Sequence, residues 1–465
     1  MITLGEVLQG IEDHRLLYPT SSRITFTGVS NDSRTLEPGA LFVALRGERD
    51  GHTFISHAFA KGARGVLAER DISLDDWLPR DRQNDFAYII VRDSLKALQK
   101  LSAYWLDKHR SRVEVIGITG SVGKTTTKEM VAAVLAHRFR VLKNERNLNN
   151  EIGLPLTVMN LDKRHEKVVL EMGMYALGEI ASLCEIAKPR IGVVTNVGPT
   201  HLERLGTIER IADAKSELVR ALPEDGVAVL NGDDTLVMRM RGLSRCRILT
   251  YGLSDNCDVK ATGVTSLGLK GLQFNILHDG QEATVRTILV GKHNVYPSLA
   301  AATVGIASGM SLDDISAGLA QTPSTIRIDV KPGLNGSMII DDSYNASPLS
   351  TIAALNVLGE LPGRKIAILG DMAELGSYEE RGHREVGECA ARLVDKLILV
   401  GPRARWIGDE ATSRGLRDVI FFDNTSQVNY EPRPGEFILV KGSRGMKMEQ
   451  IVSRLLPPAH QGNGS

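Results

Sequence analysis

The sequence predicts an α/β protein of three domains: a small α/β unit followed by two doubly wound units, each with a largely parallel sheet. Its 465 residues are too many for one ordinary core and suggest about three domains. Two long stretches each alternate apolar, strand-like runs with helical segments. The runs are apolar throughout, which is typical of parallel strands that helices cover on both faces. We place the domains at 1–91, 92–322 and 323–465.

The first domain contains short strand-like pieces (ITFTGVS, LFVAL, GVLAE and AYIIV) around one helix-like stretch, FISHAFAKGA. A helix near 94–108 leads into the second domain, whose predicted strands are 113–119, 168–173, 191–197 and 226–231. Residues 245–290 interrupt this alternation with short strands of alternating polarity, which predict an antiparallel flank.

The third domain begins near Pro323. Its predicted strands are SMIIDD, KIAILGD, KLILVG, VIFF and EFILVKG, and helical segments separate them. We expect the tail after Leu456 to be disordered.

The composition of the chain bears on its partners and its compartment. The 56 basic residues balance the 56 acidic ones, so the sequence gives no reason to expect a nucleic acid or an anionic membrane. Four scattered cysteines lack metal-ligand spacing and indicate reduced thiols. The sequence shows neither a signal peptide nor an apolar run of membrane-spanning length. We therefore expect a cytoplasmic monomer without stable membrane insertion.

A glycine-rich loop follows the strand at 113–119 and precedes a predicted helix. This order places backbone N–H groups and the positive end of the helix dipole on phosphate oxygens. Lys124 is expected at the β- and γ-phosphates and the Thr125 hydroxyl at Mg²⁺. Ile118 stands where the strict P-loop pattern has glycine, so the loop is a shortened variant, and a chance glycine turn is the alternative. The expected nucleotide-binding residues of the loop are Gly120, Ser121, Val122, Gly123, Lys124, Thr125 and Thr126.

A lysine lies on the apolar face of the amphipathic helix predicted at 207–222. At about 100° per residue, Lys215 falls among Ile208, Ile211, Leu218 and Val219. A buried lysine is costly unless it is paired or neutral. The alternative is a lysine at the rim of the buried face, with its ammonium reaching solvent.

Two further polar residues follow predicted parallel strands. Glu171 ends the strand at 168–173, and His201 follows the strand at 191–197. Ligands gather at the carboxyl ends of such strands. Together with Thr125, these residues predict a cation site with oxygen and nitrogen ligands beside the phosphates. Taken alone, a histidine such as His201 is more often structural, but its position after a central strand favours the role of a ligand.

These motifs resemble the Mur ligase family, which also includes folylpolyglutamate synthase, and the resemblance covers essentially the whole chain. In that family the loop TGSVGKTTT binds ATP, and the residues matching Glu171 and His201 hold magnesium. The lysine of the AK-x-E segment, here Lys215, is carbamylated and supports a second Mg²⁺. The resemblance thus implies two metal ions, with Thr125, Glu171, His201 and Lys215 as ligands.

The resemblance also implies substrate-binding segments. Ser30, Ser33 and Arg34 in SNDSR match a UDP-sugar recognition segment, although a polar turn would explain them equally well. Asn149 and Asn150 match a segment that contacts the nucleotide-sugar substrate, although a capped turn would use the same residues.

Further matches lie around the start of the third domain. Asn294 matches a residue beside the adenine and ribose, with Pro297 in place of the family's usual asparagine. Arg327 matches the arginine that reaches the γ-phosphate, although it follows Ile326 and not glycine. In DDSYNASP, Asp342 is expected at the ATP ribose. Asn345 is expected at the incoming amine, with a cap at the end of a strand as the alternative.

Four segments indicate the reaction within the family: EMGMYALGEIA, TNVGPTHLERLGTIERIADAKSEL, GDMAELG and KGSRGMKMEQIV. They resemble the member that joins D-alanyl-D-alanine to UDP-N-acetylmuramoyl-tripeptide. The DNPR signature of the diaminopimelate-adding member is absent. The implied chemistry is attack of the tripeptide carboxylate on ATP to give an acyl phosphate, which the dipeptide amine then opens. Lys124, Arg327, His201 and Lys215, with the metal ions, are the expected catalytic groups.

Two alternatives stay open from the sequence. One is a Mur-type ligase with a different amino donor, and the other is a nucleotide-dependent switch protein that uses the same loop without ligation. The third residue of the tripeptide is also open between meso-diaminopimelate and lysine.

Overall fold

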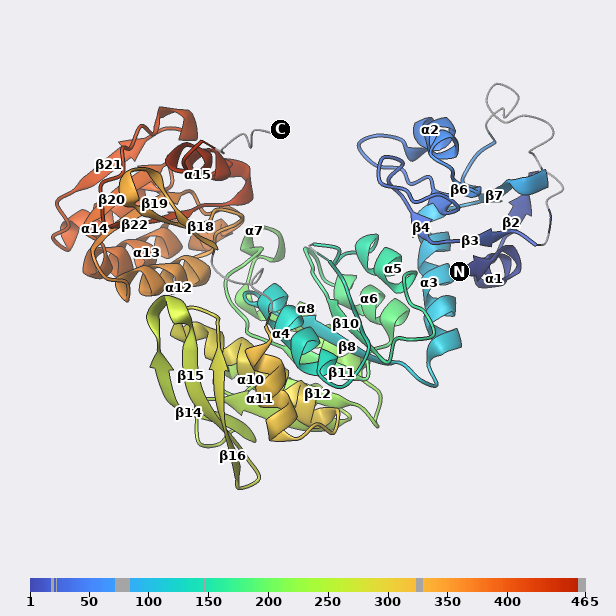
Figure 1. The fold of residues 1–465 in the computed structure, drawn as a ribbon, viewed down its shortest axis with the longest axis horizontal. Coiled ribbons are helices and arrows are strands. Elements are labelled where there is room, and N and C mark those ends of the chain that lie inside the picture. Colours follow the sequence, from blue (N-terminus) through green and yellow to red (C-terminus); the bar gives the residue numbers. More distant parts are fainter. Residues whose placement is uncertain (18–20, 22, 72–83, 146, 323–328, 459–465) are drawn as a thin grey trace, which may run out of the picture.

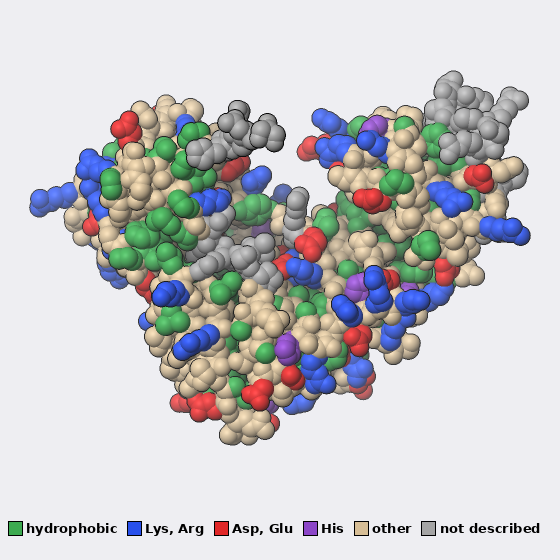
Figure 2. All heavy atoms as spheres, in the orientation of Figure 1, with side chains coloured by type: hydrophobic (Ala, Val, Ile, Leu, Met, Phe, Trp, Pro, Cys, Tyr) green, Lys and Arg blue, Asp and Glu red, His purple; other side chains and the backbone are tan. Residues whose placement is uncertain are grey.

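The computed structural model describes residues 1–17, 21, 23–71, 84–145, 147–322 and 329–458. Arg327, the expected start of the third domain at Pro323 and the last seven residues of the tail lie outside these ranges. Figure 1 shows an N-terminal and a C-terminal domain standing on a central domain. In the space-filling view a notch separates the two upper domains (Figure 2).

The N-terminal domain is built on a five-stranded sheet in the order β2-β7-β6-β5-β4, in which all pairs except β2–β7 are parallel. A separate antiparallel pair, β1–β3, lies beside it. The strands are β1 (Ile2–Thr3), β2 (His14–Leu16), β3 (Thr25–Phe26), β4 (Val29–Ser30), β5 (Leu41–Val43), β6 (Gly65–Ala68) and β7 (Ala87–Val91). The helices are α1 (Leu4–Gly10) and α2 (Ile55–Ala60), and α3 (Ser94–His109) connects to the central domain.

The central sheet has nine strands in the order β16-β15-β14-β13-β12-β11-β8-β10-β9. The strands are β8 (Glu114–Thr119), β9 (Val141–Lys143), β10 (Lys167–Glu171), β11 (Ile191–Val194), β12 (Val227–Asn231), β13 (Arg247–Gly252), β14 (Val259–Ser266), β15 (Leu272–His278) and β16 (Gln281–Thr287). The helices are α4 (Lys124–Ala136), α5 (Gly153–Val158), α6 (Glu179–Ala187), α7 (Leu202–Leu205), α8 (Ile208–Ala221), α9 (Thr235–Arg239), α10 (Val295–Ala307) and α11 (Leu312–Ala320).

The antiparallel flank predicted for 245–290 is correct for β15 and β16, which follow β14 in antiparallel order, but wrong for β13, which is parallel to both β12 and β14. β13 pairs in parallel with β12, in register from Arg247 opposite Val227 to Tyr251 opposite Asn231. For the pairing with β12 the reason is the connection, because α9 carries the chain back before β13 starts, as a parallel pairing requires.

The C-terminal domain has a six-stranded sheet in the order β17-β18-β22-β19-β20-β21, parallel except for the edge strand β17. The strands are β17 (Asp329–Pro332), β18 (Met338–Asp342), β19 (Arg364–Gly370), β20 (Lys396–Val400), β21 (Val419–Phe422) and β22 (Glu436–Lys441). The helices are α12 (Pro348–Gly359), α13 (Glu379–Leu393), α14 (Arg405–Ser413) and α15 (Glu449–Leu455).

The hydrophobic cores connect the domains unequally. One core runs from α1 through Leu98 and Leu101 of α3 into the central domain. The C-terminal sheet instead has a separate core on each face. Among the described helices, none is long and apolar enough to cross a membrane.

Candidate active site

The predicted phosphate loop connects β8 to the N-terminus of α4. Gly123 has φ 81° and caps the helix in the left-handed conformation. Gly120 has φ 152°, and a Cβ atom there would lie 1.8 Å from the hydroxyl oxygen of Thr195. Both positions therefore require glycine. The first N–H groups of an α-helix have no partner within the helix, so this end of α4 is suited to bind an anion.

Lys124, the first residue of α4, folds back over the loop. Its ammonium donates hydrogen bonds to the carbonyl oxygens of Gly120 (2.8 Å) and Ser121 (3.1 Å). Burial lowers the pKa of Lys124, and the charge of Glu171 opposes that shift. The ammonium therefore lies at the loop where phosphate oxygens would arrive.

The segment after β11 is bound to the same loop. The Asn196 side chain accepts a hydrogen bond from Val122 N (2.9 Å) and donates one to Val122 O (2.8 Å). Gly198 N donates to the Ser121 hydroxyl, which donates to Gly198 O. These bonds hold the segment leading to His201 against the loop. Asn196 was missed, although the rule that polar residues gather at the ends of parallel strands would have found it.

Glu171, at the carboxyl end of β10, is 2% exposed and joins two of the predicted residues. Its carboxylate accepts hydrogen bonds from the Thr125 hydroxyl (2.8 Å) and from the Asn149 amide (2.8 Å). Asn144 holds the Glu171 backbone by donating to its carbonyl and accepting from its N–H. The carboxylate is thus fixed beside the N-terminus of α4.

His201 precedes α7 and contacts the C-terminal domain. Its Nδ1 lies 2.6 Å from a carboxylate oxygen of Glu374, in the loop after β19. Burial lowers the pKa of His201, the charges of Lys124 and Lys215 lower it further, and Glu374 raises it. His201 therefore lies within electrostatic range of both predicted lysines.

Lys215 is 2% exposed on the inner face of α8, as the helical pattern predicted. Within the described ranges, no hydrogen bond or ion pair involves its ammonium. Burial holds the pKa of Lys215 well below its ordinary value, and the charge of Lys124 lowers it further. The neutral amine is therefore easier to form here than in an exposed lysine.

A cavity of about 470 Å³ lies between the central and C-terminal domains. Of the predicted nucleotide-binding residues, it brings together Val122, Gly123, Thr126, Asn294 and Asp342. The other lining residues are Thr127, Thr195, Asn196, Asn231, Tyr251, His293, Tyr296, Pro297, Asp341, Leu349, Ser350, Ala353, Ala354 and Lys441. This size and position suit a nucleotide whose phosphates reach the loop. A cavity of about 500 Å³ at the opposite ends of the central strands contains none of the predicted residues.

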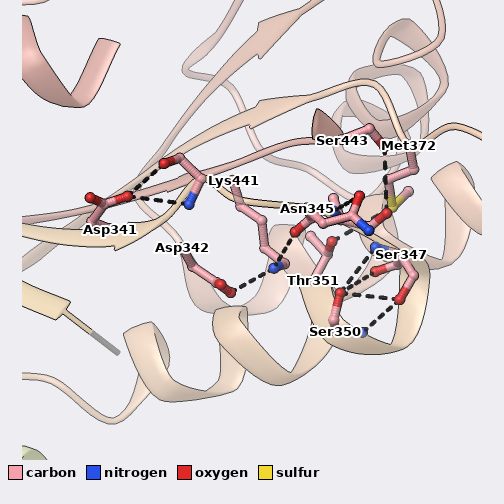
Figure 3. A network of polar contacts seen from close by, with 11 residues as sticks. Asp341, Asp342, Asn345, Ser347, Ser350, Thr351, Met372, Lys441 and Ser443 are labelled. Carbon is pink, nitrogen blue, oxygen red and sulfur yellow. Dashed lines mark hydrogen bonds and ion pairs between the residues drawn. The ribbon is translucent and has the colours of Figure 1, made fainter. Parts of the chain in front are cut away.

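Lys441 organises the C-terminal side of this cavity (Figure 3). It lies at the end of β22, is 3% exposed and donates to the Asp342 carboxylate (2.6 Å) and to Asn345 O (2.8 Å). Partial burial raises the pKa of Asp342, and the ammonium opposes this shift. The Asn345 side chain accepts from Ala346 N (2.9 Å), in the turn before α12. Lys441 is not among the residues predicted from the sequence, although it too ends a parallel strand.

Comparison with known proteins decides the family. Models described as "Mur ligase family, catalytic domain", "Mur ligase middle domain" and "Mur ligase, glutamate ligase domain" match residues 25–105, 118–305 and 326–444. The chain belongs to the Mur ligase family. A relative from Bacillus subtilis (strain 168), named UDP-N-acetylmuramoyl-tripeptide--D-alanyl-D-alanine ligase, is 39% identical over 463 residues, which cover 97% of each chain.

Solved structures confirm the three-domain Mur ligase fold. A crystal structure of MurF from Acinetobacter baumannii matches with a TM-score of 0.86 and 30% identity, over 98% of each chain. MurF ligase from Thermotoga maritima in complex with ADP matches with a TM-score of 0.76 and 30% identity. That match covers 92% of this chain and 96% of the other.

The predicted substrate residues of this Mur ligase lie in different domains, not in one cluster. Ser30, Ser33 and Arg34 are in the N-terminal domain, where Arg34 forms an ion pair with Asp32 (2.7 Å) and lowers the pKa of that carboxyl to about 2. The Ser33 hydroxyl lies 2.9 Å from His57 Nδ1. Asn150 accepts a hydrogen bond from Gly153 N (2.9 Å), as in a capped turn. Of the predicted substrate residues, only Asn149 contacts Glu171.

The side chains predicted as cation ligands in this Mur ligase carry donor atoms that suit a small cation. Glu171 and Thr125 supply oxygen atoms that already lie within hydrogen-bond distance, and His201 supplies a nitrogen. Across the described residues, no cluster of three or more His, Cys, Asp or Glu side chains is placed to hold a metal. The predicted set has only two such residues and relies on a hydroxyl and a modified lysine for the rest.

Proposed function

We propose that this Mur ligase uses ATP to join D-alanyl-D-alanine to the terminal carboxylate of UDP-N-acetylmuramoyl-tripeptide. The observation that carries the proposal is the cavity between the central and C-terminal domains, which joins the phosphate loop to Asn294 and Asp342. The names of the relatives and the ADP complex of the Thermotoga maritima protein support the choice of substrates.

The first step transfers a phosphoryl group. The tripeptide carboxylate attacks the γ-phosphorus of ATP, the bond to the bridging oxygen breaks, and ADP leaves as an acyl phosphate forms. Two anions must meet, so positive charge has to screen their repulsion. Lys124 supplies this charge at the phosphate loop, and we assign Arg327 the same task at the γ-phosphate.

The second step forms the amide. The amine of D-alanyl-D-alanine attacks the acyl carbon, and phosphate leaves through a tetrahedral intermediate while the amine loses its proton. Asn345, which lies beside Lys441 at the end of β18, is the group that we assign to the amine. Water would destroy the acyl phosphate, so the reaction requires closed domains.

We assign Thr125, Glu171, His201 and a carbamate on Lys215 to two Mg²⁺ ions. When bound, these ions supply charge that stabilises the phosphoryl oxygens. Lys215 suits the modification because it is buried and its pKa is lowered, and CO₂ reacts with the neutral amine. Ser30, Ser33, Arg34, Asn149 and Asn150 are assigned to the UDP-sugar peptide.

We place the reaction in the cytoplasm and expect a monomer. All four cysteines are free, which fits a reducing compartment. Light scattering during gel filtration measures the mass, and a dimer would contradict the second expectation.

The experiment that tests the function measures ADP release with each substrate omitted in turn. We expect release to require UDP-N-acetylmuramoyl-tripeptide and to rise when D-alanyl-D-alanine is added, with the pentapeptide product identified by mass spectrometry. ATP hydrolysis at the same rate with and without the tripeptide and the dipeptide would favour the nucleotide-dependent switch protein. Equal or faster reaction with free D-alanine or a diamino acid would leave the family intact and refute the dipeptide. Tripeptides ending in meso-diaminopimelate and in lysine, assayed in parallel, decide the third residue.

A further inference from the structure

We propose that Glu374 is a positioning residue for His201. The Glu374 carboxylate orients the His201 imidazole only when the C-terminal domain is docked on the central domain. The cation site and the domain contact then form together. This inference rests on the proposed function, in which His201 is a cation ligand.

The first observation is the hydrogen bond between His201 and Glu374. His201 Nδ1 and the Glu374 carboxylate lie 2.6 Å apart, although 173 residues separate them in the chain. A carboxylate only accepts, so Nδ1 carries the proton and donates. In the neutral imidazole the other ring nitrogen, Nε2, then has its lone pair free for a cation. Carboxylates commonly orient metal-binding histidines in this way, but here the carboxylate belongs to another domain.

The second observation is the backbone at both residues. His201 has φ 60° and Glu374 has φ 64°, so both adopt the left-handed conformation that residues other than glycine rarely adopt. Within the described ranges only seven such residues occur, and two of them face each other here. Glycine or asparagine would make either turn at lower cost. Strain of this kind is often kept where a side chain must be placed for function.

The third observation is that the imidazole is also held from the central domain. The Tyr175 ring meets it edge to face, with 5.2 Å between ring centroids, and the Arg204 guanidinium lies 5.1 Å from the Tyr175 centroid. Tyr175 limits where the ring can lie, but it cannot select which nitrogen is protonated. Glu374 supplies that selection.

The fourth observation ties Glu374 to the docked domain. α7 lies at the border between the two domains (Figure 1). Glu203 N, in α7, donates to Glu374 O (3.3 Å). Gly376 packs so closely on α7 that an added Cβ would lie 3.0 Å from Glu203 N. The loop therefore rests on the backbone beside His201, and undocking would remove the carboxylate.

A rival explanation is that Glu374 only fastens the domains together. The chain offers a matched control, because Glu360 of the C-terminal domain also accepts a bond from the central domain, from the Ser266 hydroxyl (2.5 Å). Glu360→Ala removes a bond between the domains without touching His201. Any effect of docking alone should therefore appear in both alanine variants.

The test measures Mn²⁺ binding to the full-length enzyme with ADP, from the electron paramagnetic resonance signal of free Mn²⁺. We expect Glu374→Ala to weaken Mn²⁺ binding about tenfold or more. Glu360→Ala should leave it unchanged. Glu374→Gln should keep part of the affinity, because its amide oxygen still accepts from Nδ1. ADP affinity without the cation should be the same in all variants, which shows that they are folded.

The double variant separates the possible failures. If Glu374 acts through His201, His201→Ala combined with Glu374→Ala should bind Mn²⁺ no more weakly than His201→Ala alone. Additive losses, or equal losses in Glu374→Ala and Glu360→Ala, would overturn the inference and leave the proposed function standing. If His201→Ala itself binds Mn²⁺ as the wild type does, His201 is not a ligand and the proposed cation site fails.

Discussion

Three lysines surround the candidate site, and they differ in their partners: Lys215 and Lys441 are buried, and Lys124 is half-buried. The Lys124 ammonium donates to two loop carbonyls, and that of Lys441 donates to the Asp342 carboxylate and to one carbonyl. Lys215 has no such bond among the described residues, although it is as buried as Lys441. A buried ammonium is costly without a partner. The three side chains are therefore expected to respond differently to substitution.

Replacing Lys124 with alanine should abolish turnover and preserve the fold. Its ammonium supplies charge at the phosphate loop, and losing one such group costs on the order of a hundredfold to a thousandfold in rate. ADP release measures the loss, and a circular dichroism melt shows whether the variant is folded. Activity near the wild-type level in a folded variant would refute the assignment of the loop.

Lys215→Ala should lose activity, and small carboxylates such as acetate or formate should restore part of it by supplying the missing oxygen atoms. Lys215→Arg should stay inactive because a guanidinium does not form a carbamate. Since burial lowers the pKa of Lys215, the reactive neutral amine is present above that lowered pKa and disappears as pH falls through it.

Wild-type enzyme stripped of CO₂ should therefore recover with bicarbonate, and less completely at lower pH. ADP release measures the recovery. A well-ordered map with Mg²⁺ and nucleotide bound that shows an unmodified ammonium at Lys215 would exclude the carbamate.

Lys441→Met should weaken ADP binding, because the substitution removes the ammonium that holds the Asp342 carboxylate in the cavity. If Lys441 acts through Asp342, the double variant with Asp342→Asn should bind no more weakly than the weaker single variant. Calorimetry of ADP binding measures all four proteins. Additive losses would mean that Lys441 contacts the nucleotide independently.

At the level of elements, the segment at 147–155 serves both the fold and the site. The Asn150 side chain accepts from Ile152 N (3.3 Å) and Gly153 N (2.9 Å), and Asn149 reaches Glu171. The turn that leads into α5 therefore also aims Asn149 at the carboxylate. The sequence could not separate these roles, because two adjacent asparagines favour a turn equally well.

Asn150→Ala should lower the free energy of unfolding by about 1 kcal/mol, since it removes the acceptor for two backbone N–H groups. Thermal melting measures this change, and Asn160→Ala is a control because Asn160 is exposed and bonds only within its own turn, to Leu156 O (3.2 Å). If Asn150 also binds the UDP-sugar peptide, the KM for that peptide will rise in the same variant. An unchanged melting temperature would contradict the capping role.

The elements that the sequence predicted well are those with strong local patterns. The apolar runs became β8, β10, β11 and β12, and the glycine loop lies between β8 and α4 as expected. Contacts between distant residues could not be predicted this way. Glu374 meets His201 across 173 residues, and Lys441 meets Asp342 across 99. No local pattern marks either pair, because each forms only when two strand ends or two domains meet.

At the scale of the whole molecule, the cores divide the chain differently from its three domains. The N-terminal and central domains share one core through α3, where a Cβ at Gly10 would lie 2.8 Å from Leu101. The C-terminal domain has its own cores. Its bonds to the central domain include polar ones, such as those of Glu374 and Glu360.

This division predicts that the ligand-free protein unfolds in two transitions, one for the N-terminal and central domains together and one for the C-terminal domain. Leu101→Ala should destabilise the first unit alone and Leu399→Ala the second alone, each by about 2–5 kcal/mol, because both side chains are buried. Differential scanning calorimetry measures both transitions. ADP should raise both together, since its proposed cavity is lined by Gly123 and Asn294 on one side and by Asp342 and Lys441 on the other. A single transition whose midpoint temperature both substitutions lower equally would contradict this division. It would show that the polar contacts between the domains make all three domains unfold together.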